Sequence, residues 1–157
     1  MLDINQFKDL IITPALEDLK LLSIEAIELL IFTCAVESKG GTFVKQVKGS
    51  ALGIYQMEPR TYNDIWVNYL THKLPLRLQM IHNFDCNNIP SEDRMIYDLR
   101  YATAMARIHY ARVQEPLPNA KDLKAIWNYY KLHYNTLEGK NNYHDSVVLY
   151  QKFKANY

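Results

Sequence analysis

The sequence contains few of the residues that interrupt or cross-link a chain, and it has almost no net charge. Its 157 residues include only five glycines, six prolines and two cysteines, and 18 Lys and Arg nearly balance 17 Asp and Glu. This composition, with 48% hydrophobic residues, argues against disorder and fibrous repeats. A net charge of +1 gives no overall field that would hold a nucleic acid. We therefore expect a single domain over residues 1–157, with no nucleic acid as partner.

Membrane and export segments are also missing. The most apolar stretch, residues 21–36, contains Glu25 and Glu28 and is shorter than the ~20 residues that a membrane span needs. It predicts a buried helix, and we expect no membrane span. The beginning of the chain lacks a basic region followed by a small-residue cleavage site, so we expect no secretory signal peptide.

Metal and cofactor motifs are not found either. Cys34 lies in the apolar stretch and Cys86 in a polar one, a spacing that indicates two free thiols. The five histidines show no zinc-binding spacing, and no phosphate loop or dinucleotide fingerprint occurs. We expect no metal and no cofactor.

The spacing of apolar residues predicts a mainly α-helical protein. Ser23 is a good capping residue, and the residues after it repeat at intervals of three and four, which predicts a helix over 23–36 with one broad buried face. Pro75 is expected to end or kink a later helix. The further helices predicted in this way begin at Thr13-Pro14, at Thr61, at Ser91, at Asn119 with Asp122, and at about Asp145.

Residues 42–57 differ from the rest of the chain. They mix β-branched residues with glycines and lack a helical period, so we expect a Gly-rich loop or a small β-hairpin there. No other part of the sequence has a pattern that favours β-strands. The predicted fold is therefore mainly α with one small insert.

Glu37 is the first candidate for chemistry, because it ends the apolar helix and precedes Gly40-Gly41. A carboxyl group at the last turn of a buried helix lies at the negative end of the helix dipole and is weakly solvated, and both effects raise its pKa. A general acid near neutral pH needs such a pKa. Periodicity alone leaves open that Glu37 is an ordinary exposed glutamate at a helix end.

Two motifs carry a family resemblance. Glu37-Ser38 at a helix end, followed by Gly53-Ile54-Tyr55-Gln56, resembles the motifs of soluble lytic transglycosylases and goose-type lysozymes. Residues 101–112 and 127–136 look like the small bacteriophage members of this superfamily, with Tyr134-Asn135 in place of the family's Tyr-Asn pair. The resemblance covers nearly the whole chain and implies a lysozyme-like α+β fold.

The resemblance also implies an activity. Glu37 would be the catalytic acid that protonates the glycosidic oxygen between N-acetylmuramic acid and N-acetylglucosamine in peptidoglycan, and would then act as the base. The glycan strands of peptidoglycan would be the substrate, and other virion proteins would be further partners. The residues implied to bind the substrate or orient Glu37 are Ser38, Tyr55, Gln56, Tyr134 and Asn135, although Tyr134 also continues a core stripe.

A second carboxylate decides between two enzyme mechanisms. No acid lies between Glu37 and Glu58, which favours a lytic transglycosylase with one carboxylate. Glu58 would orient a water in a hydrolytic muramidase of the same fold, the alternative enzyme. The position of Asp64 after Thr61 is explained by helix capping.

Two other classes of function remain open. The first is a virion structural or glycan-binding protein without turnover, and the second is a helical nucleic-acid module using Lys45, Lys48, Arg60 and residues 107–112. By resemblance, we expect a bacteriophage protein that opens the cell wall during entry or lysis. It would be virion-associated or made in the host cytoplasm, and would act at the cell wall or in the periplasm.

Overall fold

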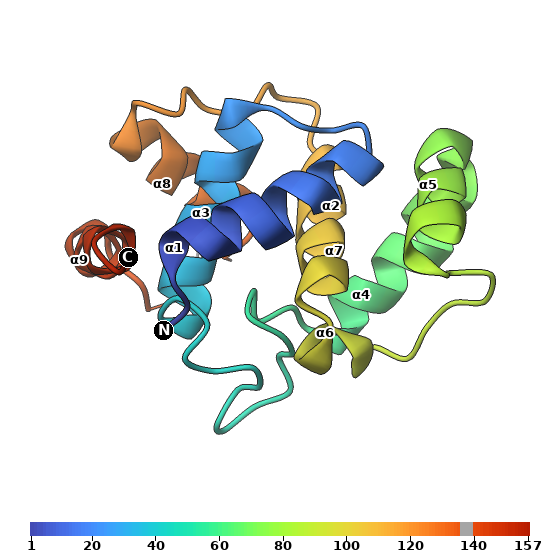
Figure 1. The fold of residues 1–157 in the computed structure, drawn as a ribbon, viewed down its shortest axis with the longest axis horizontal. Coiled ribbons are helices and arrows are strands. Elements are labelled where there is room, and N and C mark those ends of the chain that lie inside the picture. The colour runs from blue at the N-terminus through green and yellow to red at the C-terminus, as the bar shows by residue number, and fades with distance from the viewer. Residues whose placement is uncertain (136–139) are drawn as a thin grey trace.

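The structure, a computed structural model, describes residues 1–135 and 140–157 and is mainly helical (Figure 1). The predicted mainly α class is confirmed. No described helix is long and apolar enough to cross a membrane. The α-helices are α1 (Ile4–Gln6), α2 (Thr13–Asp18), α3 (Ile24–Ser38), α4 (Pro59–Asp64), α5 (Leu74–Phe84), α6 (Arg94–Tyr97), α7 (Leu99–Ala111), α8 (Leu123–His133) and α9 (Tyr143–Lys154).

The α3 helix runs through the core. Ser23 caps it as predicted, because its hydroxyl accepts a hydrogen bond from the Ala26 N–H at 3.0 Å. Every residue from Leu29 to Val36 is buried, so this part of the helix is enclosed on all sides and not only along the one broad face that was predicted. The helix ends at Ser38, two residues beyond the predicted end, where Lys39 adopts a left-handed conformation with φ of 52°. Its last turn therefore carries Glu37.

The N-terminal helical segment begins earlier than predicted. Asp3 caps α1 by accepting from the Gln6 N–H at 2.9 Å, and a π-helical stretch, Phe7–Ile12, joins α1 to α2. The α2 helix does begin at Thr13 with Pro14 in its first turn, as predicted, but Thr13 does not cap it, because the residues before it are already helical. A proline inside a helix has no N–H to donate and crowds the preceding turn, and the wider π-helical turn accommodates it.

Residues 42–57 form turns and loops without a strand, so the expected α+β fold with a β-hairpin is not supported for the described residues. Only two isolated antiparallel bridges occur, between Lys45 and Leu52 and between Leu52 and Met57. Gly53 and Gln56 both have positive φ, 72° and 47°, and they turn the chain too tightly for a ladder. Most apolar side chains of this segment are buried, so it packs onto the core as a loop.

In the middle of the chain, two prolines lie in the first turns of helices. Pro59 lies in the first turn of α4, after Glu58 at the N-cap, so the predicted start at Thr61 is wrong. A π-helical stretch, Ile65–Tyr69, and a short 3-10 helix, Leu70–His72, follow α4. Pro75 lies in the first turn of α5, a helix that the sequence patterns do not predict. Proline fits the first turn because the N–H there has no helical partner.

The remaining helices follow their capping residues. Asp98 leaves the helical conformation and accepts from the Tyr101 N–H at 2.9 Å, which splits the predicted single helix after Ser91 into α6 and α7. Asp122 caps α8 and Asn142 caps α9, so both predicted helices are confirmed. Contacts of α3 with α7, α8 and α9 close the core around it.

Candidate functional site

A polar groove lies at the end of α3. It has a volume of about 510 Å³ and is lined by side chains that come from the end of α3, from the loop over residues 42–57, from the start of α4 and from the end of α8. Its lining residues are Glu37, Gln46, Gln56, Glu58, Arg60, Tyr134 and Asn135. The structure therefore brings four of the six predicted site residues together in one groove.

The Glu37 carboxyl group is half-buried and has two donors. The Tyr130 hydroxyl donates to Glu37 Oε1 at 2.5 Å, and Asn135 Nδ2 approaches the same oxygen at 3.5 Å. Tyr130 lies in the last turns of α8, and Asn135 follows the end of that helix. Both contacts are made by residues more than 90 positions away in sequence.

Burial raises the pKa of Glu37 above that of an ordinary glutamate. The hydrogen bonds from Tyr130 and Asn135 and the charge of Lys131 act in the opposite direction, but burial outweighs them. The carboxyl group therefore keeps its proton to a higher pH than an exposed glutamate. Once ionised, it still has donors that stabilise its charge, which suits a group that gives and then takes a proton.

Tyr130 is part of the site, although its spacing predicted only a packing residue. It is completely buried and packs edge-on against Phe32, with ring centroids 5.5 Å apart. Its hydroxyl oxygen also accepts from Asn135 Nδ2 at 2.9 Å and from Asn141 Nδ2 at 3.3 Å. The signal in the sequence was that Tyr130 lies one helical turn before Tyr134, on the same face.

The Tyr134 hydroxyl holds the loop in place. It donates to the backbone carbonyl of Tyr55 at 2.8 Å, while its ring lines the groove. The side-chain amide of the neighbouring Gln56 donates to the Gly53 carbonyl at 2.8 Å. Gln56 thus closes a tight turn and presents the rest of its amide to the groove. Its left-handed backbone, with φ of 47°, is uncommon for a residue other than glycine.

The structure does not bring the Ser38 and Tyr55 side chains into the groove. The Ser38 hydroxyl is fully buried, donates to the Cys34 carbonyl at 3.0 Å and accepts from the Gly41 N–H at 2.9 Å. The Tyr55 hydroxyl is buried against Thr103, 3.2 Å away. Both side chains stabilise the turn and the core, and their roles toward a substrate stay predictions.

The two other carboxylates considered from the sequence lie in different places. Glu58 lines the groove and accepts from the Ser50 hydroxyl at 2.5 Å. Asp64 lies outside it, at the end of α4, where Arg112 Nη1 binds it at 2.6 Å and Asn68 Nδ2 at 2.7 Å. The predicted capping role of Asp64 is wrong, because α4 begins before Thr61, and its partners are an arginine and an asparagine instead.

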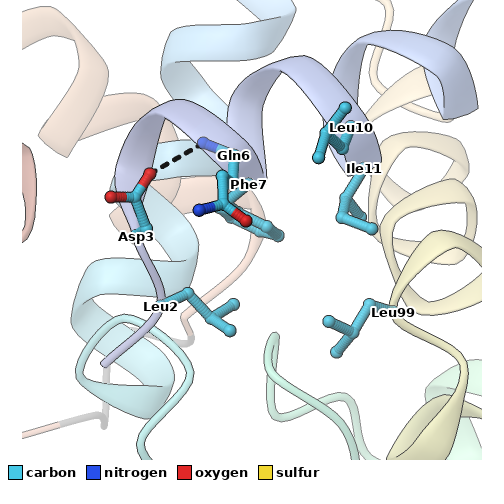
Figure 2. Close-up of a pocket in the computed structure, with 7 residues that line it drawn as sticks. All are labelled: Leu2, Asp3, Gln6, Phe7, Leu10, Ile11 and Leu99. Atoms are coloured by element: carbon cyan, nitrogen blue, oxygen red, sulfur yellow. Dashed lines mark hydrogen bonds between the residues drawn. The ribbon is translucent and has the colours of Figure 1, made fainter. Parts of the chain in front are cut away.

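The other notable features offer less chemistry. An apolar pocket of about 210 Å³ lies between the N-terminal helical segment and Leu99 (Figure 2), and its only ionisable residue, Asp3, is engaged in capping α1. Cys34 and Cys86 are free and buried, and burial raises the pKa of their thiols to about 12 and about 11. Among the described residues no group of three or more His, Cys, Asp or Glu is placed to hold a metal ion.

Comparison of the chain with protein-family models, curated proteins and solved structures found no match in any of the three. The functional argument therefore depends on the residues and the geometry of the groove.

Proposed function

We propose that this protein cleaves the glycan strands of peptidoglycan between N-acetylmuramic acid and N-acetylglucosamine, with Glu37 as general acid and then general base. The observation that carries the proposal is the Glu37 carboxyl group itself. It is half-buried at the end of a core helix, has a raised pKa, is held by Tyr130 and opens into a polar groove. The Glu-Ser and Gly-x-x-Gln motifs support the same substrate.

The reaction has two proton transfers through one group. Protonated Glu37 gives its proton to the glycosidic oxygen as the bond to C1 of N-acetylmuramic acid breaks. The resulting carboxylate then takes the proton of the C6 hydroxyl of that sugar, and O6 bonds to C1. The product is a 1,6-anhydro ring, no water is consumed, and Glu37 regains its proton. Tyr130 and Asn135 stabilise the intermediate carboxylate through their hydrogen bonds.

A hydrolytic muramidase is the second candidate, and Glu58 is the observation in its favour. Glu58 lines the same groove as Glu37 and is the only other carboxylate among the described residues that does so. In this alternative Glu58 would hold and deprotonate the attacking water, as the second carboxylate of a glycosidase does. Its hydrogen bond from the Ser50 hydroxyl occupies one of its oxygens and makes it the weaker choice.

The setting is proposed on the resemblance alone. A small muralytic protein of this kind is typical of bacteriophages, where it opens the cell wall during entry or lysis. It would work as a virion component or be made in the host cytoplasm and act at the wall. A non-catalytic glycan-binding role would use the same groove without the proton transfers.

Loss of Glu37 tests the proposal. Glu37→Gln keeps the size and polarity of the side chain but has no proton to give, so release of soluble fragments from purified peptidoglycan should fall at least ~100-fold. Glu17→Gln, at an exposed position of α2, is the matched control and should keep full activity. Helical circular dichroism should be the same for all three proteins. Substantial fragment release by Glu37→Gln would refute the assignment.

A further inference from the structure

Arg107, in α7, is a buried arginine whose guanidinium group lacks hydrogen-bond partners in the part of the chain that the structure describes. Only 9% of its surface is exposed, yet two of its side-chain nitrogens, Nε and Nη1, have no hydrogen-bond partner among the described residues. Burying an unpaired charge is among the most costly arrangements in a protein, so buried arginines are normally paired with an anion or with several acceptors. Burial also lowers the pKa of Arg107, yet a guanidinium stays charged at neutral pH.

The Arg107 side chain lines a small pocket. The pocket has a volume of about 270 Å³ and lies between α7, α8 and the loop after α7. It shares no lining residue with the Glu37 groove. Apart from Arg107 and Glu115, its walls are mainly aliphatic and aromatic, with side chains from Leu21, Tyr110, Val113, Pro116, Leu117 and Tyr129.

The polar groups around Arg107 already have other partners. The Tyr129 hydroxyl donates to the Glu115 carbonyl at 3.1 Å, and the Tyr69 hydroxyl donates to the Ala111 carbonyl at 3.0 Å. Burial raises the pKa of both tyrosines, and the charge of Arg107 opposes that rise, so neither hydroxyl is ionised to balance it. The Glu115 carboxylate faces His133 instead, at 3.3 Å.

We propose that this Arg107 pocket binds a carboxylate that carries a short aliphatic group, such as a free peptide C-terminus or a small organic acid. A carboxylate matches a guanidinium in charge and in planar, two-oxygen geometry. The aliphatic and aromatic walls fit a small apolar substituent beside it. Inorganic phosphate fits less well, because a dianion would meet only one cation and would approach the Glu115 carboxylate.

The probe for this site is N-acetyl-alanine, compared with its C-terminal amide, with acetate and with inorganic phosphate. Titration into ¹⁵N-labelled protein should move the Nε–Hε signal of Arg107 and the amide signals of Val113 and Leu117 in a saturable way. The amide analogue should bind at least roughly tenfold more weakly, because it lacks the charge. Acetate should bind more weakly than N-acetyl-alanine, because it lacks most of the atoms that would contact the apolar walls of the pocket. A dipeptide with a free C-terminus that binds more tightly would identify a peptide as the natural source of the carboxylate.

Two variants complete the test. Arg107→Met should abolish the shifts and, because it removes an unpaired buried charge, should unfold at a higher denaturant concentration than the wild type. Arg77→Met, at an exposed position of α5, is the matched control and should bind like the wild type. If Arg107→Met fails to fold, the comparison of N-acetyl-alanine with its amide on the wild-type protein still tests whether the pocket binds a carboxylate.

Three results would overturn the proposal: equal binding of the acid and the amide, binding of phosphate but not of carboxylates, or unchanged shifts in a folded Arg107→Met. The Arg107 pocket does not depend on the proposed cleavage at Glu37, and none of these readouts uses lytic activity. Failure here would leave the Glu37 assignment untouched, and Glu37→Gln should bind N-acetyl-alanine normally.

Discussion

Burial and the hydroxyl of Tyr130 act in opposite directions on the proton affinity of Glu37. Burial favours the neutral carboxyl group, whereas the hydrogen bond from Tyr130, at 2.5 Å, favours the carboxylate. Burial is the larger influence, which keeps the proton on Glu37 to a higher pH, and the hydrogen bond stabilises the carboxylate once the proton has left. Tyr130 is itself fixed by its packing against Phe32 and by its bonds from Asn135 and Asn141. Its hydroxyl therefore has little freedom to move away.

Tyr130→Phe removes that donor and keeps the ring. Hydrogen bonds to charged groups contribute about 1.5–3 kcal/mol, so the rate of peptidoglycan cleavage should fall roughly tenfold or more. Loss of a donor to the carboxylate should also raise the pKa of Glu37 further. Because the acid must be protonated, activity falls as pH rises through that pKa, and this alkaline limb should move to higher pH in the variant. A pH–rate profile measures both effects.

Tyr150→Phe is the control for Tyr130→Phe. The Tyr150 hydroxyl also donates to a glutamate of α3, Glu28, but that pair lies outside the groove. The control should change stability without moving the alkaline limb. If Tyr130→Phe and Tyr150→Phe had the same pH–rate profile, the contact between Tyr130 and Glu37 would have no part in catalysis.

Asp64→Asn should affect stability and leave the rate unchanged. The hydrogen bond from Asn68 and then the charge and hydrogen bond of Arg112 lower the pKa of Asp64. These contacts therefore stabilise the fold above the ordinary pKa of an aspartate, and their contribution is lost as pH falls through the lowered value. The Asp64 side chain is about half exposed, so solvent screens these contacts and the cost should be at most about 1 kcal/mol. Urea denaturation and the fragment-release assay measure the two quantities. A large loss of rate in a stable variant would instead make Asp64 a second catalytic carboxylate.

At the scale of elements, the loop over residues 42–57 brings Gln56, and the adjoining Glu58, into the same groove as Glu37. Gly53 is the critical point of this loop, because its φ is 72° and a Cβ there would lie 2.5 Å from the backbone oxygen of Met95. The positive φ is unfavourable for any residue with a side chain, and the backbone oxygen cannot move aside to make room for a Cβ atom. The loop therefore depends on a contact with α6 that only glycine allows.

Gly53→Ala should destabilise the protein by ~1–3 kcal/mol and lower the cleavage rate by displacing Gln56. Gly49→Ala is the comparison. A Cβ at Gly49 would meet only the end of the flexible Gln46 side chain, and its φ is not positive, so the loss of stability should be clearly smaller. Thermal unfolding of the two variants checks this, and equal losses would contradict the role given to Gly53.

Local sequence signals predicted most helices but not their breaks. The start of α3 at Ser23, and the helices α8 and α9, could be read from capping residues and apolar spacing, because both are short-range properties. The break at Asp98 comes from a capping aspartate and the start of α5 from a proline in its first turn, and neither changes the spacing of the apolar residues on which the helix prediction relied. The predicted β-hairpin is wrong because Gly53 and Gln56 adopt left-handed backbone conformations, and the β-branched residues near them in the sequence do not indicate this.

The site was predictable in part for the same reason. Glu37 stood out because it ends an apolar helix, and Gln56 and Asn135 belong to motifs with a defined order. The spacing of Tyr130 predicts only a packing residue in the core, because periodicity does not indicate where the hydroxyl group of a tyrosine points. Ser38 and Tyr55 are the opposite case: both belong to the motifs, yet their buried hydroxyls form hydrogen bonds inside the protein and do not reach the groove.

At the scale of the whole molecule, the groove forms only when distant parts of the chain meet. The core helix α3 delivers Glu37, α8 delivers Tyr130, and the two residues are separated by 93 positions. The contact of α3 with both α8 and α9 explains why a carboxyl group near the surface is held in weakly solvated surroundings. The proposed proton chemistry would thus depend on the folded protein and not on the Glu-Ser motif alone.

The most direct test of the account is mass spectrometry of the soluble products formed from purified peptidoglycan by the wild-type protein and by Glu37→Gln. We predict muropeptides that end in 1,6-anhydro-N-acetylmuramic acid with the wild type, and none with the variant. Ordinary reducing ends would contradict the single-carboxylate mechanism and would point to Glu58 as the group that activates water. No products from either protein would contradict the proposed cleavage altogether.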